Sequence, residues 1–174
     1  MISCIRLTAF MLAFSVHLNA QTTDTIAPET HFDFWVGTWD ATWEEQGGKT
    51  GRGTNTITKT LDGQVLQEQF RILEGASKGF KGTSISVYQS RFKRWKQAWA
   101  DNQGGYYDFT GRKEGDRRFF QTDIVEIADG RKVTQRMVFY DITEEAMTWD
   151  WEISYDAGET WTLQWRINYT RKKG

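Results

Sequence analysis

The chain has 174 residues, with 22 lysines and arginines against 23 acidic residues, and it holds nine tryptophans but one cysteine. This length suits one domain with a substantial core. The formal charge of −1 leaves no basic excess, which argues against general nucleic-acid binding and against a polybasic membrane patch.

Residues 1–20 have the pattern of a secretory signal peptide. A short segment with the positive charge of Arg6 precedes an apolar run that ends at Val16, and the small residue Ala20 marks the expected cleavage point. The run is too short to span a bilayer as a helix and does not recur, so we expect no transmembrane segment after signal removal. A segment retained as a membrane anchor is the alternative. We therefore expect a secreted or periplasmic protein without disulfides, since Cys4 leaves with the signal.

Residues 21–31 are polar, contain the only proline and read as a flexible leader. From residue 32 to residue 174, short segments of alternating polar and apolar residues are separated by turns that often contain glycine. This pattern predicts an all-β domain, a single closed antiparallel up-and-down barrel of about ten strands, with a two-sheet sandwich as the alternative. The expected strands are residues 34–45, 54–61, 64–73, 83–89, 94–101, 106–113, 117–127, 132–142, 147–155 and 160–171.

The last hairpin contains Ser-Tyr-Asp-Ala-Gly-Glu-Thr-Trp, which resembles the Asp-box turn of sialidase propellers. It occurs once, in a chain too short for propeller blades, so we interpret Asp156, Gly158 and Trp161 as a structural turn. With a three-residue loop at residues 156–158, Trp149 would face Trp165 across the hairpin.

That register would place Trp151 opposite Leu163 and Ile153 opposite Trp161, so that apolar residues meet across the pair. Asp150 and Glu152 would then point to a solvated outer face, although their spacing is close to that of a glycosidase acid pair.

Metal and cofactor chemistry has little support. His31 is the only histidine after the signal, and the cysteine is lost, so the usual zinc site cannot be assembled. The same scarcity makes a serine–histidine–acid triad improbable. We expect no metal, no cofactor and no catalytic residue that a motif would identify.

The segment Phe-Asp-Phe-Trp-Val-Gly-Thr-Trp, residues 32–39, resembles the opening of an uncharacterised bacterial lipocalin-like family. The match includes the Gly37-x-Trp39 signature of calycins and extends to Arg-Trp-x-x-x-Trp-x-Asp at residues 94–101 and to the last hairpin. The resemblance implies a lipocalin-like barrel in which Trp39 closes one end and Arg171 stacks on its indole ring. Nitrobindin-type barrels are also similar, but they hold haem through a late histidine that this chain lacks.

The strand at residues 94–101 carries two tryptophans, a glutamine and an aspartate on one face. Such a face suits an inward position if a ligand uses the polar groups, because unpaired buried polar groups are costly. In the alternative, the aspartate lies at the rim and the glutamine bonds to a neighbouring backbone group. If alanine substitutions on this face left ligand affinity unchanged, the site would instead be expected in the loops around residues 75–82. The residues predicted to line a ligand pocket are Trp95, Gln97, Trp99, Asp101, Trp149 and Trp151.

Three functions remain open from the sequence. The first is an exported barrel that binds a small, partly apolar molecule. The second is an accessory or catalytic protein of polysaccharide processing, whose tryptophans stack on a saccharide. The third is a barrel filled with side chains that has a structural or interaction role. Cavity volume separates the first two from the third, because small barrels are often filled.

Overall fold

The computed structural model describes residues 26–173. The expected signal peptide and the first part of the expected leader lie outside the described residues. The described chain begins with two short 3₁₀ helices, η1 (Pro28–Thr30) and η2 (Asp33–Trp35). The strands are β1 (Gly37–Glu45), β2 (Lys49–Thr60), β3 (Val65–Glu74), β4 (Lys81–Gln89), β5 (Arg94–Asp101), β6 (Tyr106–Glu114), β7 (Arg117–Thr122), β8 (Val125–Glu126), β9 (Lys132–Tyr140), β10 (Ala146–Ser154) and β11 (Thr162–Arg171).

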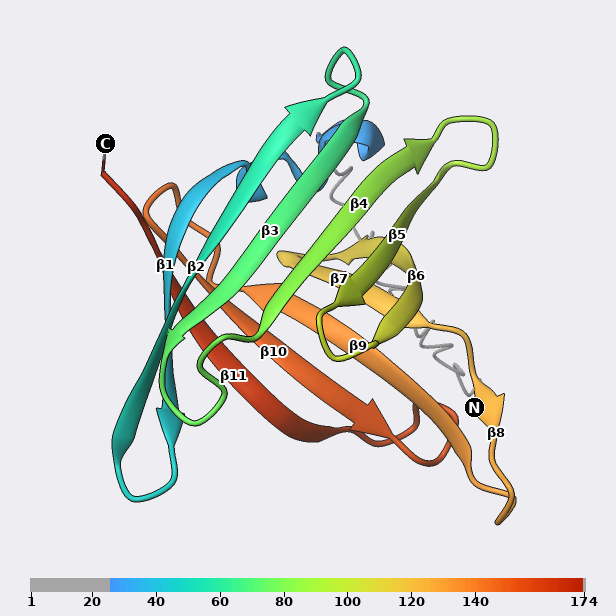
Figure 1. The fold of residues 1–174 in the computed structure, drawn as a ribbon. Coiled ribbons are helices and arrows are strands. Elements are labelled where there is room, and N and C mark those ends of the chain that lie inside the picture. Colours follow the sequence, from blue (N-terminus) through green and yellow to red (C-terminus); the bar gives the residue numbers. More distant parts are fainter. Residues whose placement is uncertain (1–25, 174) are drawn as a thin grey trace, which may run out of the picture.

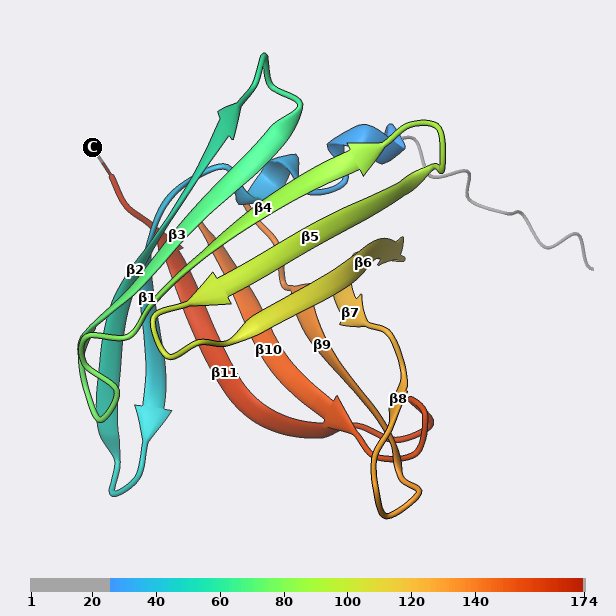
Figure 2. The same ribbon diagram turned by 45° about the vertical axis from the view of Figure 1, so that its right-hand side comes forward.

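Ten of these strands form a closed antiparallel ring (Figures 1 and 2). Neighbours in the chain pair from β1 to β7, then β7 pairs with β9, β9 with β10, β10 with β11, and β11 with β1. The short strand β8 pairs with β9 alone and stands outside the ring. The predicted barrel is thus confirmed. A two-sheet sandwich is excluded because strand pairing continues without a break around the ring.

Three expected strands differ clearly from the prediction. The strand expected at residues 54–61 begins earlier, because residues 49–53 are already part of β2. Residues 34–36, expected at the start of β1, are part of η2 or follow it directly. The expected strand 117–127 divides into β7 and β8. The break has a local cause, since the hydroxyl of Thr134 donates to the carbonyl of Thr122, and the amide of Gln135 donates to the hydroxyl of Thr122. Side chains therefore take the place of regular ladder bonds where β7 ends.

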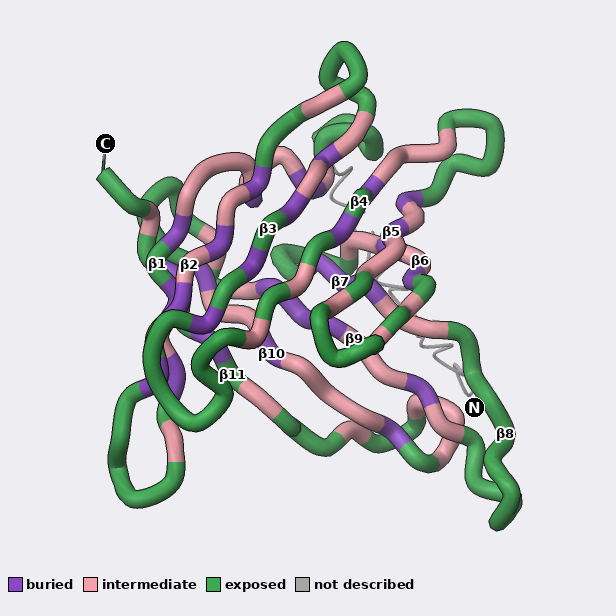
Figure 3. Tube along the Cα trace, viewed as in Figure 1, coloured by how far each residue is buried: buried purple, intermediate pink, exposed green. Residues whose placement is uncertain are grey.

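The barrel interior is built by the alternation of side chains along each strand. In β3, Leu66, Phe70 and Ile72 are buried, whereas Gln69 and Arg71 between them are exposed. Buried and more exposed positions alternate in this way along several strands (Figure 3). Residue period two thus assigns one face of each strand to the core, as the sequence predicted.

A plug formed by η1 and η2 closes one end of the barrel. Phe32 and Trp35 are both buried, and the ring of Phe32 stacks on that of Phe120 with centroids 4.3 Å apart. The indole of Trp39 donates to the carbonyl of Trp35 at 2.8 Å. Pro28, in the segment expected to be a leader, accepts a hydrogen bond of 2.8 Å from the indole of Trp95. The chain is thus attached to the barrel before β1 begins.

Arg171 ties this plug to the last strand. Its guanidinium carbon lies 4.1 Å from the ring centroid of Trp39, and the predicted stacking is confirmed. The same guanidinium donates to the carbonyls of Val36 at 2.9 Å and of Phe34 at 3.3 Å. Gly37 makes room for it, because a Cβ there would lie 2.2 Å from Nη1 of Arg171. Its φ of +138° also favours glycine.

The register predicted for the last hairpin is wrong by two residues up to Trp151 and by one residue beyond it. Trp149 pairs with Ile167, and Trp151 pairs with Trp165, with a bulge after Trp151. The turn is longer than three residues, because β10 ends at residue 154 and β11 begins at residue 162. A shift of two preserves the face of each side chain, so both β10 tryptophans still point inward.

Candidate ligand cavity

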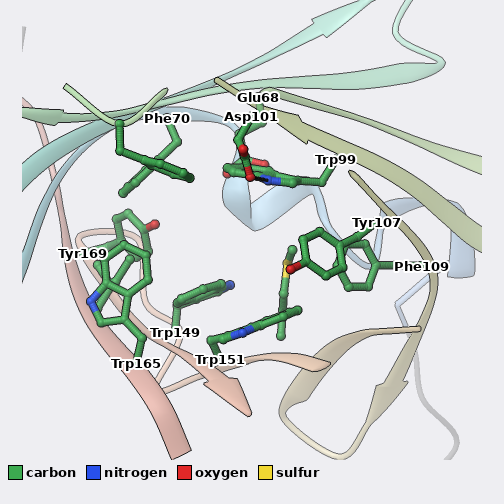
Figure 4. Close-up of a pocket in the computed structure, with 13 residues that line it drawn as sticks. Glu68, Phe70, Trp99, Asp101, Tyr107, Phe109, Trp149, Trp151, Trp165 and Tyr169 are labelled. Carbon is green, nitrogen blue, oxygen red and sulfur yellow. Dashed lines mark hydrogen bonds between the residues drawn. The ribbon is translucent and has the colours of Figure 1, made fainter. Parts of the chain in front are cut away.

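The half of the barrel opposite the plug contains a cavity of about 260 Å³. Its wall includes Trp99 and Asp101 at the end of β5 and Phe80 in the loop between β3 and β4. Nine of the thirteen lining residues are aromatic. The full lining is Glu68, Phe70, Phe80, Trp99, Asp101, Tyr107, Phe109, Met137, Trp149, Trp151, Trp165, Ile167 and Tyr169 (Figure 4).

Aromatic rings form opposite walls of this cavity. Trp149 and Trp151 lie two residues apart on the inner face of β10, with rings 6.4 Å apart and within 8° of parallel. The ring of Trp165 stands at 89° to that of Trp149. Figure 4 shows Trp99 across the cavity from the β10 pair, and Trp99 in turn stacks on Phe80 at 6.5 Å. Gly82 leaves space for Trp99, since a Cβ there would lie 2.0 Å from the indole.

Glu68 is the buried carboxyl group of the cavity, with 5% of its surface exposed. One carboxylate oxygen accepts from the side-chain amide of Asn55 at 2.7 Å, and the other accepts from the hydroxyl of Ser84 at 2.6 Å. Burial raises the pKa of Glu68 to about 7, although these two hydrogen bonds act to lower it. Glu68 therefore changes charge near neutral pH.

Tyr169 brings a phenol to the cavity from β11 and is 4% exposed. Burial raises the pKa of Tyr169, and the negative charge of Glu68 raises it further, so the phenol remains protonated at neutral pH. The inner part of the cavity thus combines an ionisable carboxyl group with a hydroxyl group, inside walls that are otherwise mostly aromatic.

Asp101 lies at the rim and stabilises the turn between β5 and β6. Burial acts to raise the pKa of Asp101, but hydrogen bonds from the amides of Gly105 and Gln103 and from the indole of Trp99 lower it overall. The two amides donate to one carboxylate oxygen at 2.9 Å each. Asp101 is therefore ionised at neutral pH and keeps a structural role at the mouth.

The structure brings together four of the six predicted pocket residues, namely Trp99, Asp101, Trp149 and Trp151. Gln97 and Trp95 share their strand face but are absent from the cavity wall. Trp95 is at the plugged end, where its ring packs on Phe32 at 5.2 Å.

Gln97 is 2% exposed and belongs to a hydrogen-bonded cluster behind Glu68. Its side-chain amide donates to the hydroxyls of Ser86 at 2.9 Å and Ser84 at 3.3 Å, and Ser84 donates to Glu68. Gln97 thus acts on the cavity through Ser84. The sequence carried a signal for Glu68, because it falls among Leu66, Phe70 and Ile72 on the buried face of β3.

The Asp-box turn lies outside the cavity and is held by its own hydrogen bonds. The carboxylate of Asp156 accepts from the hydroxyl of Ser154 and from the amide of Thr160, and Gly158 has a φ of +93°. These bonds lower the pKa of Asp156 to about 2. The expectation that Trp161 faces Ile153 is wrong, since its indole instead packs against Arg136, whose guanidinium carbon lies 3.8 Å from the ring.

Asp150 and Glu152 each pair with an arginine. Asp150 forms two hydrogen bonds with Arg166, at 2.7 and 2.6 Å, and accepts a third from the hydroxyl of Tyr140. It is therefore only 4% exposed, and the expectation of a solvated carboxylate is wrong for this residue. Glu152 pairs with Arg136 at 2.6 Å. Because both carboxylates form ion pairs with arginines, we interpret Asp150 and Glu152 as structural residues.

A second hollow, of about 370 Å³, lies beside β8 and is lined by residues of β6 to β9 and of the segment that joins β7 to β9. Its two carboxylates, Asp108 and Asp123, are both exposed. Among residues 26–173, no group of three or more histidine, cysteine or acidic side chains is placed to hold a metal ion. Over the same range, no helix is long and apolar enough to cross a membrane.

No family model matches the chain, and no curated protein matches it. Among solved structures, the chain is similar to a redesigned β-barrel, with 12% sequence identity and a TM-score of 0.42. That similarity covers 83% of this chain and 96% of the redesigned barrel. The chemistry of the cavity is therefore what indicates the function.

Proposed function

We propose that this protein is an exported, lipocalin-like barrel that binds a small, largely apolar molecule in the cavity at its open end. The observation that carries this proposal is a hollow of about 260 Å³ with nine aromatic residues in its wall, in a barrel whose other end is plugged. Ligand pockets commonly combine such apolar walls with a few polar groups that orient the ligand. Here Glu68, Asp101 and Tyr169 are polar groups of this kind.

The cavity volume supports binding over a purely structural role, because a filled barrel has no space for a guest. It lies just below the usual range for drug-sized ligands, roughly 300–1,000 Å³, so we expect a ligand with one to three rings. Both carboxylate oxygens of Glu68 already accept hydrogen bonds from the protein. We therefore infer that Glu68 is held in place to contact the ligand and does not transfer protons during catalysis.

A saccharide is the second candidate ligand. The nearly parallel rings of Trp149 and Trp151 form a flat platform of the kind on which a sugar ring can stack. A sugar also needs many hydrogen-bonding groups, and the cavity wall offers few. We therefore place the saccharide second.

The test is a titration with N-phenylnaphthylamine, a neutral dye that fluoresces in apolar surroundings. We expect saturable binding by the protein and an affinity about tenfold lower for Trp149→Ala, which removes one cavity wall. Trp161→Ala is the matched control, since Trp161 lies against Arg136 outside the cavity and its loss should leave the affinity unchanged.

Circular dichroism checks that each variant is folded. Absence of dye binding, or an equal loss of affinity in both variants, would refute the cavity as the binding site. Displacement of the dye by neutral disaccharides, with no displacement by one- to three-ring aromatic compounds, would favour the saccharide.

A further inference from the structure

The charged groups of the cavity are all acidic. Its two carboxyl groups, Glu68 and Asp101, are accompanied by no lysine, arginine or histidine among its lining residues. Within the described part of the chain, Glu68 forms no ion pair with a basic side chain. A buried carboxylate without a counter-ion is unfavourable, and its raised pKa reflects that cost.

Hydrogen-bond acceptors are also in excess around Glu68. The buried oxygen Oδ1 of Asn55 and the buried oxygen Oε1 of Gln97 have no hydrogen-bond partner among the described residues. Each oxygen of Glu68 accepts one bond and has a further lone pair. Asn55 and Gln97 are not part of the cavity wall, so a guest meets this excess of acceptors through Glu68 alone. The free lone pairs of Glu68 favour a guest that brings positive charge or hydrogen-bond donors.

The aromatic walls favour the same kind of guest. The faces of tryptophan, tyrosine and phenylalanine carry partial negative charge and attract cations, with tryptophan the strongest of the three. Trp99, Trp149, Trp151 and Trp165 all line this cavity. Aromatic rings around a desolvated carboxylate are complementary to an organic ammonium ion and disfavour an anion.

We propose that the ligand of this cavity is an organic ammonium ion with an apolar body, whose positive charge is held between the tryptophan faces and the carboxylate of Glu68. This inference rests on the proposed function and specifies the chemical class of its ligand. The apolar body packs against the other aromatic residues, and the ammonium group supplies the counter-charge that no basic side chain gives to Glu68.

Binding of such a cation depends on pH through Glu68. Of the groups around it, Asn55 and Ser84 do not titrate, Tyr169 remains protonated, and Asp101 is ionised across the neutral range. Because Glu68 loses its proton near pH 7, the affinity for a cation rises through that pH and levels off above it.

The experiment compares three compounds that displace bound N-phenylnaphthylamine. They share a phenethyl group and carry a trimethylammonium group, a neutral tert-butyl group of the same shape, or a carboxylate in its place. We expect the cation to displace the dye at a concentration about tenfold lower than the neutral compound, with the anion weakest. The quaternary ammonium does not titrate, so the rise in its affinity from about pH 6 to about pH 8 reports the protein group.

Glu68→Gln should abolish most of the preference for the cation and its pH dependence, while dye binding continues. Glu44→Gln is the matched control, because Glu44 is exposed on β1 and its replacement removes the same charge outside the cavity wall. Equal displacement by all three compounds in the wild-type protein would overturn the inference even if Glu68→Gln failed to fold. In that case dye binding would still support the proposed function, whereas absence of dye binding would refute both.

Discussion

Replacing Arg171 by methionine tests the closure of the barrel, because one side chain joins β11, β1 and the plug. Methionine keeps an apolar stem and removes the guanidinium group. The loss includes the stacking on Trp39 at 4.1 Å and the hydrogen bonds to the carbonyls of Val36, Phe34 and Glu144. With about 1 kcal/mol for the cation–π contact and about 1 kcal/mol for each of the three bonds, we expect a loss of about 3–4 kcal/mol.

Urea unfolding followed by tryptophan fluorescence measures this loss. For a slope of about 2 kcal/mol per M, the midpoint should fall by about 1.5–2 M without a change in slope. Arg171→Lys should recover only part of the loss, because lysine keeps the charge but lacks the planar fork.

Arg131→Met is the matched control for this prediction. Arg131 also stacks on an aromatic ring, that of Tyr155 at 4.7 Å, and pairs with Asp129, but it lies on the surface. Its replacement should cost less than about 1 kcal/mol. If Arg171→Met were no more destabilised than Arg131→Met, the attachment of the plug through Arg171 would be refuted.

Three further predictions concern stability, the cavity and export. Since the pKa of Glu68 is raised from 4.5 to about 7, the unfolded state loses this proton first as pH rises, and stability should fall by about 3 kcal/mol between those values. Urea titrations should find that contribution absent from Glu68→Gln, and equal pH profiles would contradict it. Gly82→Ala should push Trp99 into the cavity and weaken dye binding about tenfold, and unchanged affinity would argue against this contact. Sequencing of the exported protein should find Gln21 at its N-terminus, and a chain that retains Met1 would rule out cleavage.

The candidate site was predicted from the sequence only in part. Alternation placed Trp99, Asp101, Trp149 and Trp151 on inner faces, and all four line the cavity. The same alternation placed Gln97 on such a face, but it could not tell how far along the barrel each residue lies. Whether an inward side chain contacts the plug or the cavity depends on its position along the barrel axis, and only the folded structure fixes that position.

Glu68 is a cavity residue that the sequence did not identify. Its position among buried neighbours in β3 indicated an inward side chain, but its charge suggested a solvated one. Its burial is tolerated because Asn55 from β2 and Ser84 from β4 donate to both of its oxygens. Those donors are 13 and 16 residues away in the chain and become neighbours only when the three strands pair.

By itself, the sequence determined the class of fold and the approximate number of strands in the ring, because residue period two and turn residues are local signals. The contact of Trp39 with Arg171 was implied by the resemblance to lipocalin-like barrels. Only the tertiary structure decided that residues 28–35 plug one end, that the last hairpin pairs out of the expected register, and that a hollow remains at the other end. Each of these depends on the packing of side chains from strands far apart in the chain, where volume and hydrogen-bond geometry select the arrangement.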